Sequence, residues 1–163
     1  MENGNAGLQP IGAEERLKQL GIELPVPPTP FGAYVEAAQT GRLLFLSGML
    51  PVVDHKLKYV GRLGKELDAD SGRDALYTAS LSALAATRAH LGTLDRVTRV
   101  VRLGVFLATS GDFFDQPRVA DAASELFERI FGKEKTSARL VLGVASLPLG
   151  APVELEVILE VAE

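Results

Sequence analysis

The last segment of the chain alternates strictly between apolar and other side chains, and this pattern constrains the fold more than any other. Every second position from residue 153 to residue 161 is apolar: Val153, Leu155, Val157, Leu159 and Val161. The positions between them hold three acids and one isoleucine: Glu154, Glu156, Ile158 and Glu160. Because successive side chains of a strand point to opposite faces of a sheet, the segment 152–161 predicts a strand with one face buried under other elements.

The remaining sequence supplies further strands and the helices that would cover them. Val-rich or alternating segments predict strands at 34–38, 42–47, 96–109 and 137–146, and a short one at 57–60. Apolar and small residues at helical spacing predict helices at 73–91 and 117–131, which end at Gly92 and Gly132. This order of elements predicts one α+β domain, in which two helices pack on one face of a mixed β-sheet.

An N-terminal extension precedes this domain. Residues 13–20 predict a short helix, with acidic residues early and Gly21 at its end. The proline-rich stretch 24–30 can neither continue a helix nor pair in the middle of a sheet, so we expect an extended connector along the surface. We therefore divide the chain into an extension of residues 1–30 and a core domain of residues 31–163.

Alternation also predicts how the sheet is covered. In the strand at 137–146 the leucines Leu140 and Leu142 oppose Arg139, so we expect Arg139, like Glu154, to avoid the more apolar face.

The strand at 96–109 carries apolar residues on both faces, with Val100 and Phe106 beside Arg102 on the side that two helices would leave open. The simplest cover for that side is another copy of the chain in a closed ring. We therefore predict a homo-oligomer with clefts at its subunit boundaries.

Composition narrows the possible partners and cofactors. The formal net charge is −4 and only 6% of the residues are aromatic, so the chain lacks the basic field and the stacking surfaces that nucleic-acid binding uses. The absence of cysteine excludes disulfides, a thiol nucleophile and zinc–thiolate sites, and the two histidines, His55 and His90, are far apart in sequence. We expect no metal, no cofactor and no nucleic-acid partner.

The sequence also lacks membrane and export signals. Its start has no basic region followed by an apolar run, and no segment approaches the roughly 18 uninterrupted apolar residues of a membrane span. We expect no membrane partner and a cytoplasmic location.

Two charged residues interrupt segments that are otherwise typical of a core. Arg139 lies in the run Ser137–Val141, and Glu154 follows fifteen residues later. A guanidinium in apolar surroundings is costly unless a carboxylate satisfies its fork of donors. A ligand carboxylate would make Arg139 an anion-binding residue. The alternative is a structural ion pair of Glu154 with Arg139 or with a cation of another subunit.

Four motifs carry a resemblance to a known family: Phe31-Gly32-Ala33-Tyr34, Leu44-Phe45-Leu46-Ser47-Gly48, Ser137-Ala138-Arg139 and the run 147–156. From about Leu17 to Val161 the chain resembles the Rid (YjgF-type) family, also labelled endoribonuclease L-PSP, and especially its branch with an N-terminal extension. The resemblance implies a chorismate-mutase-like α+β fold, assembled as a trimer whose small-molecule sites lie between adjacent subunits.

The resemblance also implies an activity and a set of site residues. Members with the matching arginine hydrolyse reactive enamine or imine intermediates made from amino acids and release a 2-oxo acid and ammonia. By this resemblance Arg139 holds the carboxylate of a small metabolite, the main chain at Val141 orients it, and Glu154 positions or activates water. The remaining matches are the catalytic candidate Ser47 and the binding candidates Tyr34 and Asp121, of which Asp121 falls near the family's pocket asparagine.

Several positions depart from the family pattern. Val35-Glu36 stands where typical deaminating members carry Ser-Gln, and Met49 stands where they often carry Gln. Leu140 replaces a small polar residue, and Asp121 would place an acid close to an anionic substrate. A non-catalytic protein that binds a small carboxylate metabolite in the same cleft is therefore the alternative. The ribonuclease implied by the family's older label is least favoured, because the chain is acidic and poor in aromatic residues.

Overall fold

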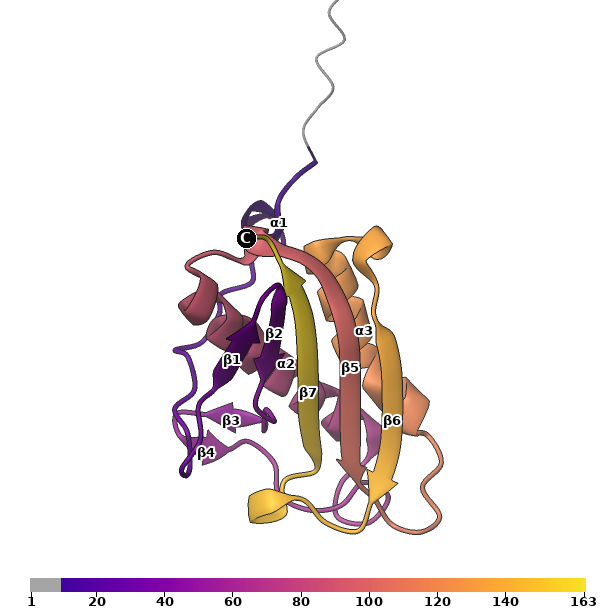
Figure 1. Ribbon diagram of the computed structural model, residues 1–163. Helices are drawn as coiled ribbons and strands as arrows, with labels where there is room; N and C mark the ends of the chain where they lie inside the picture. The colour runs from indigo at the N-terminus through magenta and orange to yellow at the C-terminus, as the bar shows by residue number, and fades with distance from the viewer. Residues whose placement is uncertain (1–9) are drawn as a thin grey trace, which may run out of the picture.

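The computed structural model describes residues 10–163, which form a five-stranded sheet with helices on one face (Figure 1). The strands are β1 (Ala37–Thr40), β2 (Leu43–Leu46), β5 (Val97–Ala108), β6 (Ala138–Val144) and β7 (Val153–Val161). Their order in the sheet is β1-β2-β7-β5-β6, in which β5 and β6 are parallel and all other neighbours are antiparallel. A separate hairpin consists of β3 (Val52–Val53) and β4 (Lys56–Leu57).

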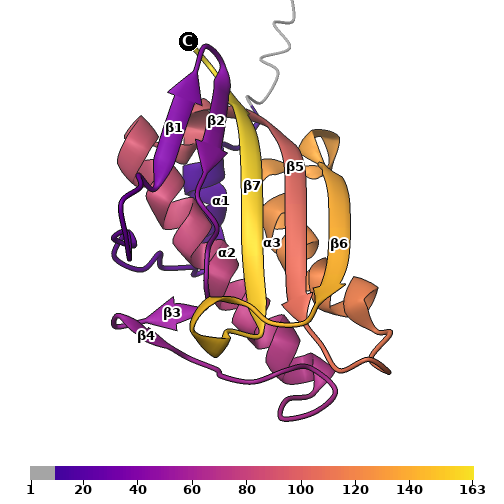
Figure 2. The same ribbon diagram turned by 60° about the horizontal axis from the view of Figure 1, so that its bottom comes forward.

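Two long helices, α2 (Ala69–Leu91) and α3 (Gln116–Phe131), cover one face of the sheet (Figure 2). The opposite face, which carries no helix of residues 10–163, is termed the open face below. The other described helical elements are α1 (Ala13–Gln19) and the 3-10 turns η1 (Leu94–Arg96), η2 (Lys133–Lys135) and η3 (Pro148–Gly150). The predicted α+β fold, with two helices packed on one face of a mixed sheet, is confirmed. No helix in the described part of the chain has the length and apolar character to cross a membrane.

The helix α2 begins and ends at residues suited to those positions. The Asp68 side chain accepts a hydrogen bond from the Ser71 backbone N–H at 2.8 Å, which satisfies one of the free donors of the first turn. Gly92 ends the helix with a φ of 83°, a conformation that glycine adopts without a Cβ clash. Between these ends, the fully buried Ala75 and Ala79 allow the helix to pack closely on the sheet.

The strand β7 lies between β2 and β5, and its predicted alternation is confirmed. The apolar row has at most 1% of its surface exposed and belongs to the core under the helices: Val153, Leu155, Val157, Leu159 and Val161. The row that contains Glu154 is half-buried on the open face. Successive side chains of β7 therefore point alternately into the core and onto the open face.

The expectation that Arg139, like Glu154, avoids the more apolar face of the sheet is wrong. Arg139 pairs in register with the buried Leu103 and contacts α3, whereas Leu140 and Leu142 lie on the open face and are 40% and 42% exposed. The hydropathy of β6 predicts the wrong covered face because β6 is at the edge of the sheet. There its helix-facing row meets polar residues of α3 at the margin of the core. Arg139 and Glu154 therefore stand on opposite faces.

Three segments differ clearly from their predicted bounds. The helix predicted at 73–91 begins earlier, at Ala69. Residues 34–36 precede the sheet, because the chain bends there, and β1 begins at Ala37. The strand expected at 57–60 is replaced by the β3–β4 hairpin, whose turn residues Asp54 and His55 have φ values of 50° and 62°.

The described part of the N-terminal extension packs against the core domain. Leu17 of α1 is 2% exposed and belongs to the same hydrophobic cluster as the sheet residues. Glu14 accepts hydrogen bonds from Arg88 Nε at 3.0 Å, from Arg88 Nη2 at 2.7 Å and from the Leu94 backbone N–H at 2.9 Å. These contacts attach α1 to α2 and η1. The domain boundary at residue 30 stays a prediction.

Replacing Leu17 by alanine should destabilise the whole protein, because α1 contributes this side chain to the common core. Truncation of a fully buried leucine costs about 2–5 kcal/mol of unfolding free energy. Urea unfolding followed by circular dichroism measures this quantity. The control is Val26→Ala in the connector, where the side chain is 86% exposed and the change should stay below about 0.5 kcal/mol. Equal effects of the two substitutions would contradict the packing of α1.

Candidate functional site

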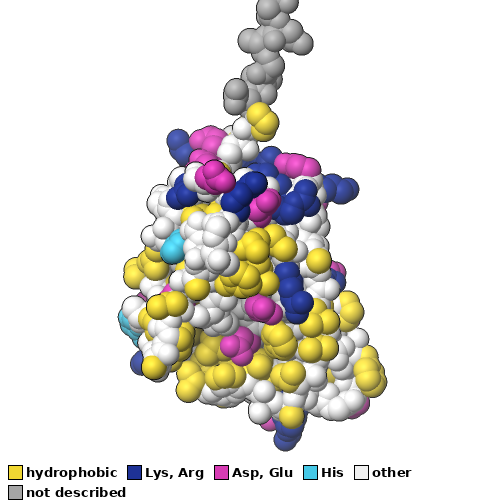
Figure 3. All heavy atoms as spheres, viewed as in Figure 1, with side chains coloured by type: hydrophobic (Ala, Val, Ile, Leu, Met, Phe, Trp, Pro, Cys, Tyr) yellow, Lys and Arg dark blue, Asp and Glu magenta, His cyan; other side chains and the backbone are white. Residues whose placement is uncertain are grey.

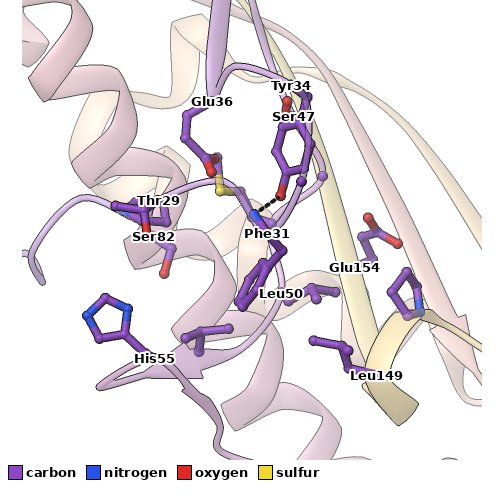
Figure 4. A pocket seen from close by; sticks show the side chains of 16 residues that line it. Thr29, Phe31, Tyr34, Glu36, Ser47, Leu50, His55, Ser82, Leu149 and Glu154 are labelled. Carbon is purple, nitrogen blue, oxygen red and sulfur yellow. Dashed lines mark hydrogen bonds between the residues drawn. The ribbon is translucent and has the colours of Figure 1, made fainter.

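A cavity of about 460 Å³ lies where the connector, the end of β2, the β3–β4 hairpin and the start of β7 meet (Figure 4). Three of the predicted site residues line it, namely Tyr34, Ser47 and Glu154. Most of the remaining wall is apolar and includes Phe31 and Leu149. A mostly apolar cavity of this volume with a few polar groups is typical of a small-molecule site.

The chain after β2 runs beside β7 and brings Gly48 to Glu154. Met49 N donates to Leu155 O at 2.8 Å, and Leu155 N donates to Met49 O at 2.9 Å. This pair of hydrogen bonds extends the contact between the two segments beyond the end of β2. Glu154 precedes Leu155 directly, so the pair fixes its position against the Gly48 backbone.

Gly48 leaves the space that the Glu154 side chain occupies. A Cβ atom at residue 48 would lie 2.1 Å from Glu154 Oε1 and 2.9 Å from its carboxyl carbon. Any other side chain at this position would displace the carboxylate. The close approach of Glu154 therefore explains why the Ser47-Gly48 motif has glycine at position 48.

Hydrogen bonds hold the hydroxyl groups of Ser47 and Tyr34. Ser47 Oγ donates to the Val35 carbonyl oxygen, and Ser47 N donates to the Glu36 carbonyl oxygen at 2.9 Å. The Tyr34 hydroxyl oxygen accepts a hydrogen bond from Phe31 N at 3.0 Å. Because the Ser47 hydroxyl donates its hydrogen bond to a backbone carbonyl, its oxygen can accept a hydrogen bond from a ligand. In this arrangement no base of residues 10–163 activates the hydroxyl as a nucleophile.

Glu154 is a half-buried carboxylate on the cavity wall. Among residues 10–163 its carboxylate has no hydrogen bond or ion pair, and burial raises the pKa of the carboxyl above its ordinary value of 4.5. A carboxyl group with a raised pKa exchanges protons closer to neutral pH than an exposed one does. This environment suits Glu154 to acid–base chemistry.

Glu36 is a second carboxylate on the cavity wall, and the sequence did not identify it as a site residue. Burial raises the pKa of the Glu36 carboxyl as well. The signal that could have found it is the departure from the family's Ser-Gln after the tyrosine, which turns a neutral amide into an acid. No Lys or Arg stands among the described residues that line the cavity.

The other three predicted site residues, Arg139, Asp121 and Val141, lie away from this cavity. Arg139 Nη1 lies 2.7 Å from Asp121 Oδ1 and 3.1 Å from Ser124 Oγ, both on α3. Val141 is partly buried and packs against the core. One chain does not bring Arg139 to Glu154, so the ion pair between them that the sequence left open is not formed, and Asp121 occupies that role.

The connector, through Pro28 and Thr29, and the adjoining Phe31 form one wall of the cavity, whereas α1 contributes no residue to it. His55 lines the cavity from the turn of the β3–β4 hairpin. Within residues 10–163 no group of three or more His, Cys, Asp or Glu side chains is arranged to hold a metal ion.

Comparison with known proteins identifies the family. The family model described as "YjgF/chorismate mutase-like, putative endoribonuclease" matches residues 14–161. The chain belongs to the YjgF/Rid family. The resemblance to this family inferred from the motifs is thereby confirmed, whereas the assignment to the branch with an N-terminal extension stays a prediction.

Relatives of this YjgF/Rid chain are found among curated proteins and solved structures. Protein TCP17 of Trypanosoma cruzi is 41% identical over 145 residues, which cover 88% of this chain and 91% of that protein. A 2-iminobutanoate/2-iminopropanoate deaminase of Dermatophagoides farinae is 29% identical and covers 83% of this chain and 91% of that protein. The crystal structure of Atu1372 from Agrobacterium tumefaciens has a TM-score of 0.84 at 36% identity, over 92% of both chains.

The substitution Gly48→Ala should displace the Glu154 side chain. The added Cβ overlaps the carboxylate, which is the far end of a flexible side chain and can move aside. A crystal structure of the variant shows whether the side chain has moved. The control is Gly111→Ala, because a Cβ there meets nothing within 4 Å. An unmoved Glu154 in Gly48→Ala would contradict the close contact.

The substitution Glu154→Gln should raise the melting temperature at neutral pH. A carboxyl whose pKa is raised in the folded state opposes folding when it is ionised, whereas below its unfolded pKa it is protonated in both states and has no such effect. Calorimetry measures the melting temperature at about pH 7, above the unfolded-state pKa of the carboxyl, and at about pH 3.5, below it. The gain should be present at the higher pH and absent at the lower. A lower melting temperature of the variant at neutral pH would contradict a desolvated charge at Glu154.

Proposed function

We propose that the protein hydrolyses imine and enamine derivatives of amino acids to 2-oxo acids and ammonia. The observation that carries the proposal is the Glu154 carboxylate, which is half-buried, without a partner among the described residues, and placed in a cavity with Ser47 and Tyr34. The relative named as an imine deaminase supports the same chemistry.

Glu154 supplies the proton transfers that this hydrolysis needs. The ionised carboxylate takes a proton from water while the water oxygen adds to the imine carbon, and it returns that proton to the nitrogen. In the second step the carboxylate takes the proton of the new hydroxyl group and gives it to the amine. The C–N bond then breaks with its electron pair on nitrogen, ammonia leaves and the carbonyl forms. An enamine enters the same sequence after a proton moves from its nitrogen to its carbon.

We propose that Arg139 of a neighbouring copy binds the substrate carboxylate. Arg139 and Glu154 of one chain lie on opposite faces of the sheet, so a single subunit does not unite them. A head-to-tail contact between the β6 edge of one copy and the cavity of the next would do so, and repetition of such a contact closes a ring. The family resemblance favours a trimer as that ring.

The open face of the sheet supports an oligomer. Apolar side chains with 38–42% of their surface exposed gather on it (Figure 3): Leu43, Phe45, Leu140 and Leu142. Extended apolar patches are rare on monomers and mark interaction surfaces. Arg102 Nε is also buried on this sheet without a hydrogen-bond partner in the described part of the chain, although its side chain lies 3.9 Å from Glu156 Oε2.

The pairing of Arg139 with Asp121 leaves much of the guanidinium available. Both described contacts of Arg139 use Nη1, so Nε and Nη2 have no partner among residues 10–163. An arginine has five N–H donors, and a bidentate carboxylate takes two of them. The Val141 backbone lies on the same edge strand, two residues further along, where we expect it to orient the substrate.

The second candidate function is a non-catalytic protein that binds a small carboxylate metabolite in the same cleft. Asp121 favours it, because this acid partly neutralises the residue that should hold the carboxylate. A ribonuclease is disfavoured, since the described cavity wall has two carboxylates and no Lys or Arg to hold phosphate. The cytoplasmic location stays a prediction.

Ammonia release from freshly generated 2-aminoacrylate tests the proposed function. The wild-type protein should accelerate it, and Arg139→Ala and Glu154→Gln should each lower kcat/KM by about a hundredfold. This is the low end for loss of general acid–base catalysis and near the upper end for loss of one charge-assisted carboxylate contact. Arg129→Ala on the exposed side of α3 is the control and should keep the wild-type rate. Light scattering verifies that all variants have the same oligomeric mass. A wild-type protein that binds 2-oxo acids without acceleration would support the binding protein instead.

A further inference from the structure

The cavity extends well beyond the reaction centre proposed at Glu154. In Figure 4 Glu36 lies on the side of Ser82 and His55, whereas Glu154 lies on the other side of the Phe31 ring. The two carboxylates therefore occupy different ends of one cavity. A substrate whose imine carbon is at Glu154 would direct its side chain past Phe31 toward Glu36.

The Glu36 end of the cavity carries an acid without a compensating charge. Glu36 is half-buried, and its carboxylate has no hydrogen bond or ion pair in the described part of the chain. The other ionisable side chains on the described wall are Tyr34, His55 and Glu154, so no Lys or Arg balances it. Burial without a counter-charge disfavours the ionised form, which raises the pKa of the Glu36 carboxyl. A ligand cation at this end would remove the imbalance.

We propose that Glu36 selects substrates whose side chain ends in a cation, such as an ammonium or guanidinium group. The inference rests on the imine hydrolysis proposed above and assigns its substrate class. The substrate carboxylate meets Arg139 of a neighbouring copy, the imine carbon meets Glu154, and the charged end of the side chain meets Glu36.

The apolar part of the cavity wall suits the methylene stem of such a side chain. Phe31, Leu50 and Val52 line the cavity together with Pro28, so an aliphatic stem buries apolar surface while its charged head reaches an acid. The volume of about 460 Å³ lies within the range of sites for ligands much larger than 2-aminoacrylate. Size and charge therefore point to the same substrate class.

L-Arginine and L-citrulline provide a matched pair of substrates, because they differ in the replacement of a guanidinium by a neutral urea of similar shape. An L-amino-acid oxidase with catalase converts each amino acid to its imine, and ammonia release by the added protein is measured over the spontaneous rate. For the wild-type protein the arginine-derived imine should have a kcat/KM at least about tenfold higher than that of the citrulline-derived imine, as expected for one charge-assisted contact. In Glu36→Gln this ratio should fall to about one.

A control separates the cavity acid from a general charge effect. Glu23→Gln changes the same net charge at an exposed residue just before the connector and outside the cavity, and it should keep the wild-type ratio. A ratio near one in the wild-type protein, or a ratio that Glu36→Gln leaves unchanged, would overturn the assignment of Glu36 while imine hydrolysis itself stands.

Binding keeps the assignment testable if the protein hydrolyses neither imine. Isothermal titration calorimetry with L-arginine and L-citrulline should then show tighter binding of L-arginine by the wild-type protein and loss of that preference in Glu36→Gln. Equal binding of the two amino acids, or no binding of either, would overturn the assignment. Thermal unfolding of Glu36→Gln verifies its fold, and removal of a desolvated charge should not lower its melting temperature.

Discussion

The two-sided pairing of β7 between β2 and β5 is the constraint on which the rest of the structure depends. Its apolar row is fully buried under the helices, and each such side chain contributes about 1.5–3 kcal/mol by leaving water. A shift of one residue in register would turn the glutamates of this strand into the core. The register that stabilises the fold therefore also places Glu154 on the open face, at the end of the strand where the cavity lies.

The cavity depends on the same strand through backbone contacts as well as through the Glu154 side chain. The reciprocal hydrogen bonds between Met49 and Leu155 bring the residues after β2 against β7, and Gly48 is the residue that tolerates the nearby Glu154 carboxylate. Burial of this carboxylate opposes folding, as its raised pKa indicates. The large core under β7 contributes enough stability to offset the unfavourable burial of this carboxylate. Groups that oppose folding are common at functional sites.

The fold could be predicted from the sequence because its signals are local and periodic. Alternation marks β7, and Gly92 marks the end of α2. Alternation states which residues share a face but not which face is covered, and for the edge strand β6 the leucines misled the assignment of Arg139. Glu36 could not be placed from the sequence, because it lies in an irregular segment and reaches the cavity only through the bend that precedes β1. Only its departure from the family pattern indicated that the position matters.

The proposed site combines Arg139 and Asp121 of one copy with the cavity of another. The charges of these two parts explain why the proposed substrate class and the proposed assembly depend on each other. Arg139 is paired with Asp121, and the cavity adds Glu36 and Glu154 without a cation among its described residues. A site that unites these halves from two copies holds one cation and three carboxylates, so a ligand that brings only another carboxylate increases the repulsion. A ligand with a carboxylate at one end and a cation at the other meets an opposite charge at both, which offsets the desolvation of Arg139 and of Glu36 in a single binding event.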